Sequence, residues 1–252
     1  MTSLPLPARR DSLLLWVAIT CNLLVVTMVN QQIYTSRWAF AELRPDYIAH
    51  SPPTISRALE EPSVGDPFAI WMLICAPALF LSILLFTSYF RNRLARQPGV
   101  DPRQLKWITV FSVAIVGLQA LASTGMIMLS QFRFPDHHEM HMVGSYLFFF
   151  SQAGVVFVGS HLSNLHDRVD DAQRVLPRSS CRFRRYYVLV PYTLSVLYLG
   201  LFIVKGIDLS PWNDLLYHAY VTTELILISS FLFFLLSWVS DCLATLRGYR
   251  PS

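Results

Sequence analysis

Long apolar runs separated by short polar segments dominate this chain. Six runs approach or exceed the roughly 20 residues that a helix needs to cross a bilayer core, and of the Asp, Glu, Lys and Arg residues only Glu224 falls inside one. The runs lack the alternation of barrel strands, and only helices or closed barrels satisfy their backbone hydrogen bonds in lipid. The pattern predicts an all-α polytopic membrane protein, a single six-helix transmembrane bundle over residues 1–252, with spans at 13–29, 67–90, 107–132, 142–162, 186–204 and 215–239.

Basic residues divide unevenly between the two sides that these spans define. Fifteen of the 20 Lys and Arg residues lie in the N-terminal segment, in segments 91–106 and 163–185, and after Val239. The remaining five lie in the segments on the other side, 30–66, 133–141 and 205–214. By the positive-inside rule we expect both termini in the cytosol and the 30–66 loop on the outer side. The basic loops would then face anionic lipid, which explains the net charge of +4 without a nucleic-acid partner.

The overall composition supports the membrane assignment. Hydrophobic residues make up 54% of the chain and charged residues only 14%, against about a quarter in an ordinary soluble domain. The sequence contains no glycine-rich phosphate cradle and no internal repeat. We therefore expect an integral membrane protein that uses no cofactor.

Polar residues inside the spans are candidates for function because each is costly to bury in lipid. Glu224 lies about 14 Å along its span at 1.5 Å per residue, and Tyr217 and Tyr220 share its helical face. Lys205 lies near the outer end of the fifth span, where we expect it to extend outward. Three readings stay open: a hydrogen-bonded cluster that joins helices, a lipid-headgroup site, and a proton-linked step. The other mid-span polar residues are Asn22, Gln119 and Gln152.

The segment 135–141 concentrates most of the proton-transfer and metal-binding capability of the chain. His137 and His141 are four residues apart and could share a helix face, and Asp136 is a candidate helix cap. The zincin pattern would need a histidine at position 142, which is Met142. The histidine boxes of membrane desaturases need a second box on the same side.

The other close histidine pair of the chain does not supply that second box. His161 and His166 lie about 30 Å away at the opposite end of the helix. We therefore expect no metal. Two interpretations of the segment remain: a solvated, helix-capping cluster at the membrane interface, which the sequence favours, and a general acid or base role for His138 or His141.

Several short motifs resemble the Frag/DRAM/Sfk superfamily of six-span membrane proteins. Within it, the similarity points to the branch of post-GPI-attachment factors that act in GPI-anchor lipid remodelling. The motifs follow the chain in order and cover its whole length: Pro5-Leu6-Pro7 with Arg10-Asp11, Pro53-Thr54-Ile55-Ser56-Arg57-Ala58-Leu59, the pair His138-Glu139, Glu224 in the last span, and Trp238 with Asp241 at its exit.

The resemblance implies a Golgi or other endomembrane protein needed when lyso-GPI proteins are reacylated, as the acyltransferase itself or an essential subunit. Acyl transfer would place a general base near the headgroup plane, and His138 with Glu139 as its orienting group is the available pair. Ser56 is a candidate for a covalent relay in such a transfer. Glu224 is the third candidate catalytic residue. The alternative is a DRAM- or Sfk-like organiser that affects lipid distribution or autophagy without chemistry. Candidate lipid-binding residues are Ser56, His141, Gln152, Tyr217, His218 and Tyr220.

The expected partners follow from the same resemblance. They are membrane lipid, lyso-GPI-anchored proteins and a further membrane protein.

Overall fold

A computed structural model describes residues 8–248, and all the regular elements in that range are helical. Six helical segments are long and apolar enough to cross a membrane, as the sequence predicted. The fifth of these is built from two consecutive helices, α7 and α8. The elements in order are α1 (Arg9–Leu43), α2 (Pro45–Ile48), α3 (Ile55–Ala58), α4 (Pro62–Ala95), α5 (Pro102–Gln131), α6 (His138–Asp167), η1 (Asp171–Gln173), α7 (Arg178–Tyr187), α8 (Leu189–Val204) and α9 (Asn213–Leu246).

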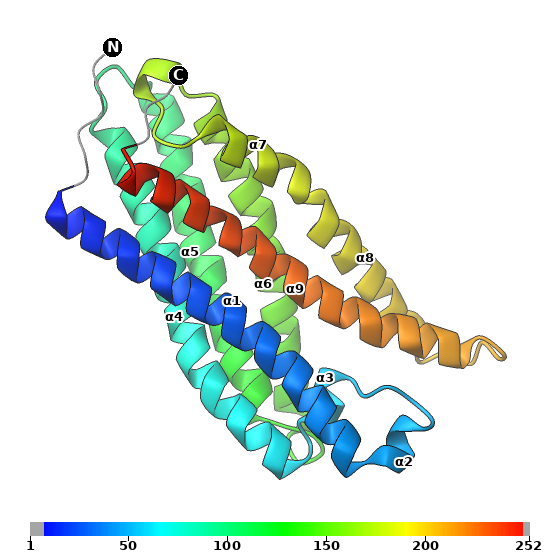
Figure 1. Ribbon diagram of the computed structural model, residues 1–252. Helices are drawn as coiled ribbons and strands as arrows, with labels where there is room; N and C mark the ends of the chain where they lie inside the picture. The colour runs from blue at the N-terminus through cyan, green and yellow to red at the C-terminus, as the bar shows by residue number, and fades with distance from the viewer. Residues whose placement is uncertain (1–7, 249–252) are drawn as a thin grey trace.

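The long helices pack as an incomplete ring (Figure 1). Around the bundle α8 packs on α9, α9 on α1, α1 on α4, α4 on α5 and α5 on α6. At one end of the bundle, α7 contacts both α6 and α9 and so completes the ring there. Further along, α6 and α8 make few contacts with each other. Only Pro191 of α8 is buried. The bundle is therefore closed at the α7 end and open between α6 and α8.

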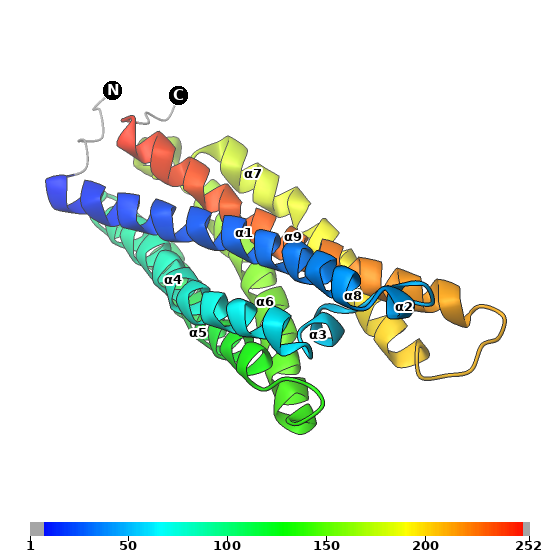
Figure 2. The same ribbon diagram turned by 60° about the horizontal axis from the view of Figure 1, so that its bottom comes forward.

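Prolines set several helix ends that the apolar runs do not mark. The loop expected over 30–66 is shorter than predicted, because α1 continues to Leu43 and is ended by Pro45. Helix α4 begins at Pro62, where a proline fits the first turn. The short helices α2 and α3 lie between α1 and α4 in the chain, and Figure 2 shows them near the C-terminal end of α1. We call this end of the bundle the α3 end. Its position outside the cytosol remains a prediction.

Two glycines bring α5 and α6 into backbone contact. A Cβ added at Gly125 would lie 2.7 Å from the carbonyl oxygen of Gly144, and one at Gly144 would lie 2.7 Å from the backbone nitrogen of Leu129. Small residues allow such close helix packing in membranes. Helix α5 ends just before Phe132, and α6 carries His141. The close packing of α5 and α6 therefore also sets the distance between Phe132 and His141 in the site described below.

We expect Gly125→Val to destabilise the bundle, because the added side chain must force α5 and α6 apart. Overpacking of this kind costs about 1–3 kcal/mol. The melting temperature of the purified protein in detergent should fall by roughly 5 °C. Gly117→Val is the matched control on the same helix, since a Cβ at Gly117 meets no other described atom within 4 Å. Equal melting temperatures for the two variants would contradict the prediction.

Candidate functional site

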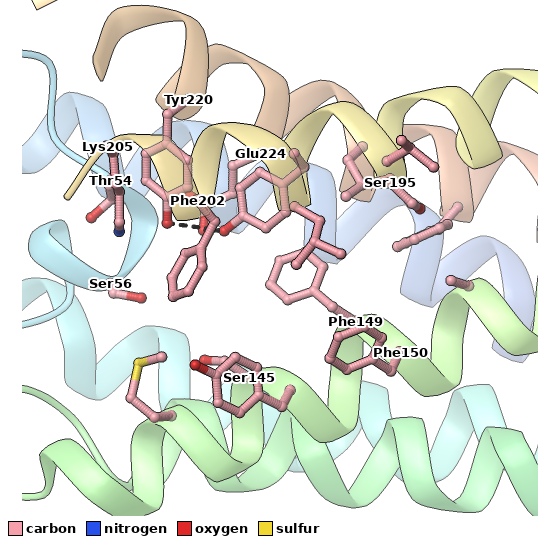
Figure 3. A pocket seen from close by; sticks show the side chains of 18 of the residues that line it. Thr54, Ser56, Ser145, Phe149, Phe150, Ser195, Phe202, Lys205, Tyr220 and Glu224 are labelled. Atoms are coloured by element: carbon pink, nitrogen blue, oxygen red, sulfur yellow. Dashed lines mark hydrogen bonds between the residues drawn. The ribbon is translucent and has the colours of Figure 1, made fainter. Parts of the chain in front are cut away.

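A cavity of about 460 Å³ lies between α3, α6, α8 and α9. Its wall is polar at the α3 end and apolar deeper in the bundle. In Figure 3, Ser56, Thr54, Lys205, Tyr220 and Glu224 gather at one end, and Phe149, Phe150 and Ser195 lie further along. The apolar arm is lined by Phe149, Phe150, Ala153, Val156, Phe157, Val188, Pro191, Tyr192, Val196 and Leu199.

The apolar arm is open to the surroundings of the bundle. Phe150, Phe157, Tyr192 and Val196 line it, and yet their exposed fractions are 53–60%. These side chains belong to α6 and α8, the two helices that scarcely touch. In a membrane the opening would face lipid, so a lipid chain could enter from the side.

Helix α3 is held over the polar end of the cavity by bonds to its flanks. The side chain of Arg37 donates to the carbonyl oxygen of Pro53 at 3.0 Å, just before the helix. Arg133 donates to the carbonyl oxygen of Leu59 at 3.3 Å, just after it. Thr54 caps the helix by accepting from the backbone N–H of Arg57 at 3.1 Å. This one-turn helix therefore presents Ser56 in a fixed position.

Ser56 and His141 form a hydrogen-bonded pair in the cavity wall. The Ser56 Oγ lies 2.8 Å from Nε2 of His141, and Nδ1 of His141 lies 2.9 Å from the carbonyl oxygen of Phe132. A carbonyl oxygen only accepts, so Nδ1 carries the proton of the neutral ring and Nε2 accepts from the Ser56 hydroxyl. His141 is 2% exposed, and the Phe134 ring packs against it at a centroid distance of 4.6 Å. A serine and an oriented histidine base are the elements of nucleophilic catalysis.

Glu224 lies beside this pair and connects α9 to both α3 and α8. Its Oε2 accepts from the backbone N–H of Ile55 at 3.5 Å, and its Oε1 accepts from the Tyr198 hydroxyl at 3.3 Å. The Tyr198 hydroxyl also lies 3.1 Å from that of Tyr220, and the Nζ of Lys205 sits 4.1 Å from the Tyr220 ring centroid. The carboxyl group is thus buried and hydrogen-bonded, as a carboxyl at this depth requires.

Arg57 and Glu60 also line the cavity, where they form an ion pair. Both lie outside the long helices. Burial raises the pKa of Glu60, and the charge of Arg57 partly opposes that rise. Together with Lys205, Arg57 gives the cavity two cationic side chains, which suits a phosphate-bearing headgroup.

The sequence model of the Frag1/DRAM/Sfk1/Cwh43P N-terminal domain matches residues 12–243. The chain belongs to this family. No curated protein and no solved structure matches the chain. In this Frag1-family chain, two stretches that carried the sequence resemblance, 53–59 and Glu224, meet at the bond between Ile55 and Glu224.

Other predicted site residues lie at different distances from the cavity. Tyr217 and Tyr220 line it with Ser56 and His141, whereas His138 and Glu139 are exposed and do not line it. The ring of His138 packs edge-on against Phe134 at 4.8 Å. Of the two histidines that the sequence offered as a general base, His141 lines the cavity and His138 does not.

Two of the predicted lipid-binding residues lie away from the cavity. His218 is exposed, with Nδ1 2.8 Å from the carbonyl oxygen of Asp214. Gln152 is buried in the core, and neither of its amide atoms has a partner among the described residues.

The mid-span polar residues do not form one cluster with Glu224. Asn22 donates to the carbonyl oxygen of Leu235 at 3.3 Å and to Ser82, and Gln119 donates to Ser123 on its own helix. The principal partner of Glu224 is instead Tyr198, which sequence reasoning missed. Nothing in a single sequence pairs residues on separate helices. Lys205, expected to extend outward, folds back over Phe202 and Tyr220.

The histidine-rich segment contains no assembled metal site. Across residues 8–248, no group of three or more His, Cys, Asp or Glu side chains is placed to hold a metal ion. His141 uses both ring nitrogens in the contacts above, and His137 packs against Phe132. The helix cap expected from Asp136 is absent, because α6 is preceded by His137 and has no side-chain cap.

Proposed function

We propose that this chain is a factor in GPI-anchor lipid remodelling that acts when lyso-GPI proteins are reacylated, as the acyltransferase or an essential subunit. The observation that carries the proposal is the cavity, which joins a polar end containing Ser56, His141 and Glu224 to an apolar arm open between α6 and α8. Family membership and the motifs around Ser56 and Glu224 support the same pathway. The site would lie on the luminal side of a Golgi or other endomembrane, where GPI anchors reside.

The dimensions of the cavity suit a single lipid chain. Its lining runs along α6 from His141 to Phe157, about 24 Å at 1.5 Å per residue. One leaflet of a bilayer core is roughly 15 Å thick, half of about 30 Å. A chain from the α3-end leaflet could therefore lie in the arm with its ester at the polar end. A lyso-lipid headgroup would meet Arg57 and Lys205 there.

Filling the apolar arm should stop remodelling. In cells that lack the chain, we expect Ala153→Trp to leave GPI-anchored proteins with the lipid of the null cells, because the indole occupies the space of the acyl chain. The measurement is mass spectrometry of the anchor lipid, with an immunoblot for abundance. Val143→Trp is the matched control, since Val143 lies on the same helix, is 52% exposed and does not line the cavity.

Two results would count against the proposal. Unchanged anchor lipid in the null cells would exclude a role of this chain in GPI-anchor remodelling. It would favour the alternative of a non-enzymatic membrane organiser of the DRAM or Sfk type. Full rescue by Ala153→Trp at normal abundance would mean that the function does not require the apolar arm of the cavity.

A further inference from the structure

We propose that Ser56 is an acyl-carrying nucleophile, with His141 as its general base and acid, so that the chain transfers an acyl group through a covalent serine ester. The identity of the final acceptor rests on the proposed function, but the covalent site is argued from geometry alone. The sequence had favoured His138 as the base.

The first argument is the geometry of the pair. A nucleophile and its base should lie within about 2.6–3.2 Å, with a third group that orients the base. The Ser56 Oγ and His141 Nε2 are 2.8 Å apart, and the Phe132 carbonyl holds the opposite ring nitrogen at 2.9 Å. That carbonyl fixes the tautomer in which Nε2 takes the serine proton. It plays the orienting part that a carboxylate plays in other serine enzymes.

The second argument is the position of the pair. A buried Ser–His contact with no access to substrate would be a structural bond. Here Ser56 is only half-buried, and it lines the cavity at its polar end. Ser56 and Glu224 also border a smaller inner cavity of about 50 Å³. An ester whose chain lies in the arm would bring its carbonyl carbon to Ser56.

The third argument is that α3 is rigidly placed, as a nucleophile-bearing segment must be. Ile55 and Ala58 of this helix are buried, and the N–H of Ile55 donates to Glu224. Arg37 and Arg133 hold its flanks. A nucleophile held in place in this way lies close to a bound substrate in the geometry that the reaction needs, which lowers the entropic cost of the step.

The chemical step balances without a cofactor. The acyl donor is a fatty acyl ester of a membrane phospholipid, whose phosphate would meet Arg57 and Lys205. The Ser56 hydroxyl gives its proton to His141 Nε2 while Oγ bonds to the ester carbonyl carbon. The bond from that carbon to the donor oxygen breaks, and the leaving alcohol takes the proton from Nε2. The hydroxyl of a lysolipid then repeats the exchange in reverse, receives the acyl group and restores the Ser56 hydroxyl.

The test is covalent labelling of the purified full-length chain with a long-chain alkyl fluorophosphonate probe. We expect label on Ser56, located by tandem mass spectrometry, and none on Ser56→Ala. His141→Ala should slow labelling by about 100-fold, the size of a typical general-base contribution. Ser63→Ala and His50→Ala are the controls, because Ser63 and His50 are exposed and outside the cavity lining. Both should label at the wild-type rate.

The outcomes separate this inference from the proposed function. Absence of label on Ser56 in folded protein, or equal labelling rates for His141→Ala and His50→Ala, would overturn the covalent mechanism even if the chain proves necessary for GPI remodelling. Ser56 labelling that depends on His141 would support it even if the anchor lipid of null cells is normal. Folding is checked for each variant by its melting temperature. Ser56→Cys supplies a second test, because a thiol in this place should react with a thiol-reactive alkyl probe faster when His141 is present than when His141→Ala is added.

Discussion

Arg184→Ala is expected to remove most of the folded protein, although Arg184 lies on α7, at the end of the bundle opposite α3 (Figure 1). Arg184 on α7 and Asp241 on α9 form an ion pair with an Nη2–Oδ2 distance of 2.7 Å, and both side chains are 0% exposed. Removing one partner of such a pair leaves an uncompensated buried charge and costs about 3–5 kcal/mol. Total stabilities of folded proteins are only about 5–15 kcal/mol.

The surroundings of Arg184 explain why no other group can replace it. Its Nε donates to the Ser163 hydroxyl on α6 at 2.8 Å, and its Nη1 donates to the carbonyl oxygen of Ser237 on α9 at 3.3 Å. Its guanidinium lies 4.7 Å from the Trp238 ring centroid, and Trp238 stacks on Phe86 of α4. One side chain thus joins α6, α7 and α9, the helices that close the ring where α8 leaves it open.

Thermal unfolding in detergent measures this effect. We expect the melting temperature of Arg184→Ala to fall on the order of 10 °C. Arg178→Ala is the matched control on the same helix, because Arg178 is 51% exposed and its pairs with Asp167 and Asp171 are of the surface type, worth roughly 0–1 kcal/mol. The double replacement Arg184→Met with Asp241→Leu should recover much of the loss. Similar melting temperatures for Arg184→Ala and Arg178→Ala would refute the assignment.

The helices of this fold could be predicted from sequence because each apolar run carries its own signal. Burial of the backbone in lipid leaves a run of about 20 apolar residues little choice but a helix. The ends were less predictable, since α1 continues through polar residues until Pro45 stops it. Arg184 was counted within a basic segment, and only the packing of α7 against α6 and α9 reveals that it is buried.

The structure places some of the candidate site residues in the cavity and others outside it, and the difference has a geometric cause. Ser56, His141 and Glu224 were all identified as candidates, because polar groups near apolar runs are costly and conspicuous. The choice between His138 and His141 depended on where α6 begins and how it is rotated. The helix begins at His138, so the side chain one turn later faces the bundle while His138 and Glu139 remain exposed. A sequence does not specify that rotation.

Glu224→Gln is expected to abolish most of the proposed remodelling activity at near-normal protein abundance. A glutamine has the size of glutamate but replaces one acceptor oxygen with a donor nitrogen. Glu224 uses both oxygens as acceptors, from the Ile55 N–H and from the Tyr198 hydroxyl. The amide oxygen can accept from only one of them, the amide nitrogen can only donate to the Tyr198 hydroxyl, and the ionisable proton is lost as well.

The effect should reach the chemistry through α3. Ile55 directly precedes Ser56, so weakening its bond to Glu224 allows the serine to shift relative to His141. A displacement of about 1 Å at a reacting group can cost on the order of 100-fold in rate. Tyr198→Phe is the informative comparison, because it removes only the hydroxyl and leaves the Ile55 contact in place. We expect it to lower activity less than Glu224→Gln does.

Complementation in null cells, scored by the anchor lipid of GPI proteins and by immunoblot, decides between a working site and architecture. A carboxylate that only joins helices should tolerate glutamine, since the amide still hydrogen-bonds. Full rescue by Glu224→Gln would therefore assign Glu224 to structure alone. Loss of activity together with slower alkyl fluorophosphonate labelling of Ser56 would connect the carboxylate to the nucleophile. Loss of activity with unchanged labelling would instead place the role of Glu224 in binding the lipid acceptor, because the serine would still be correctly positioned.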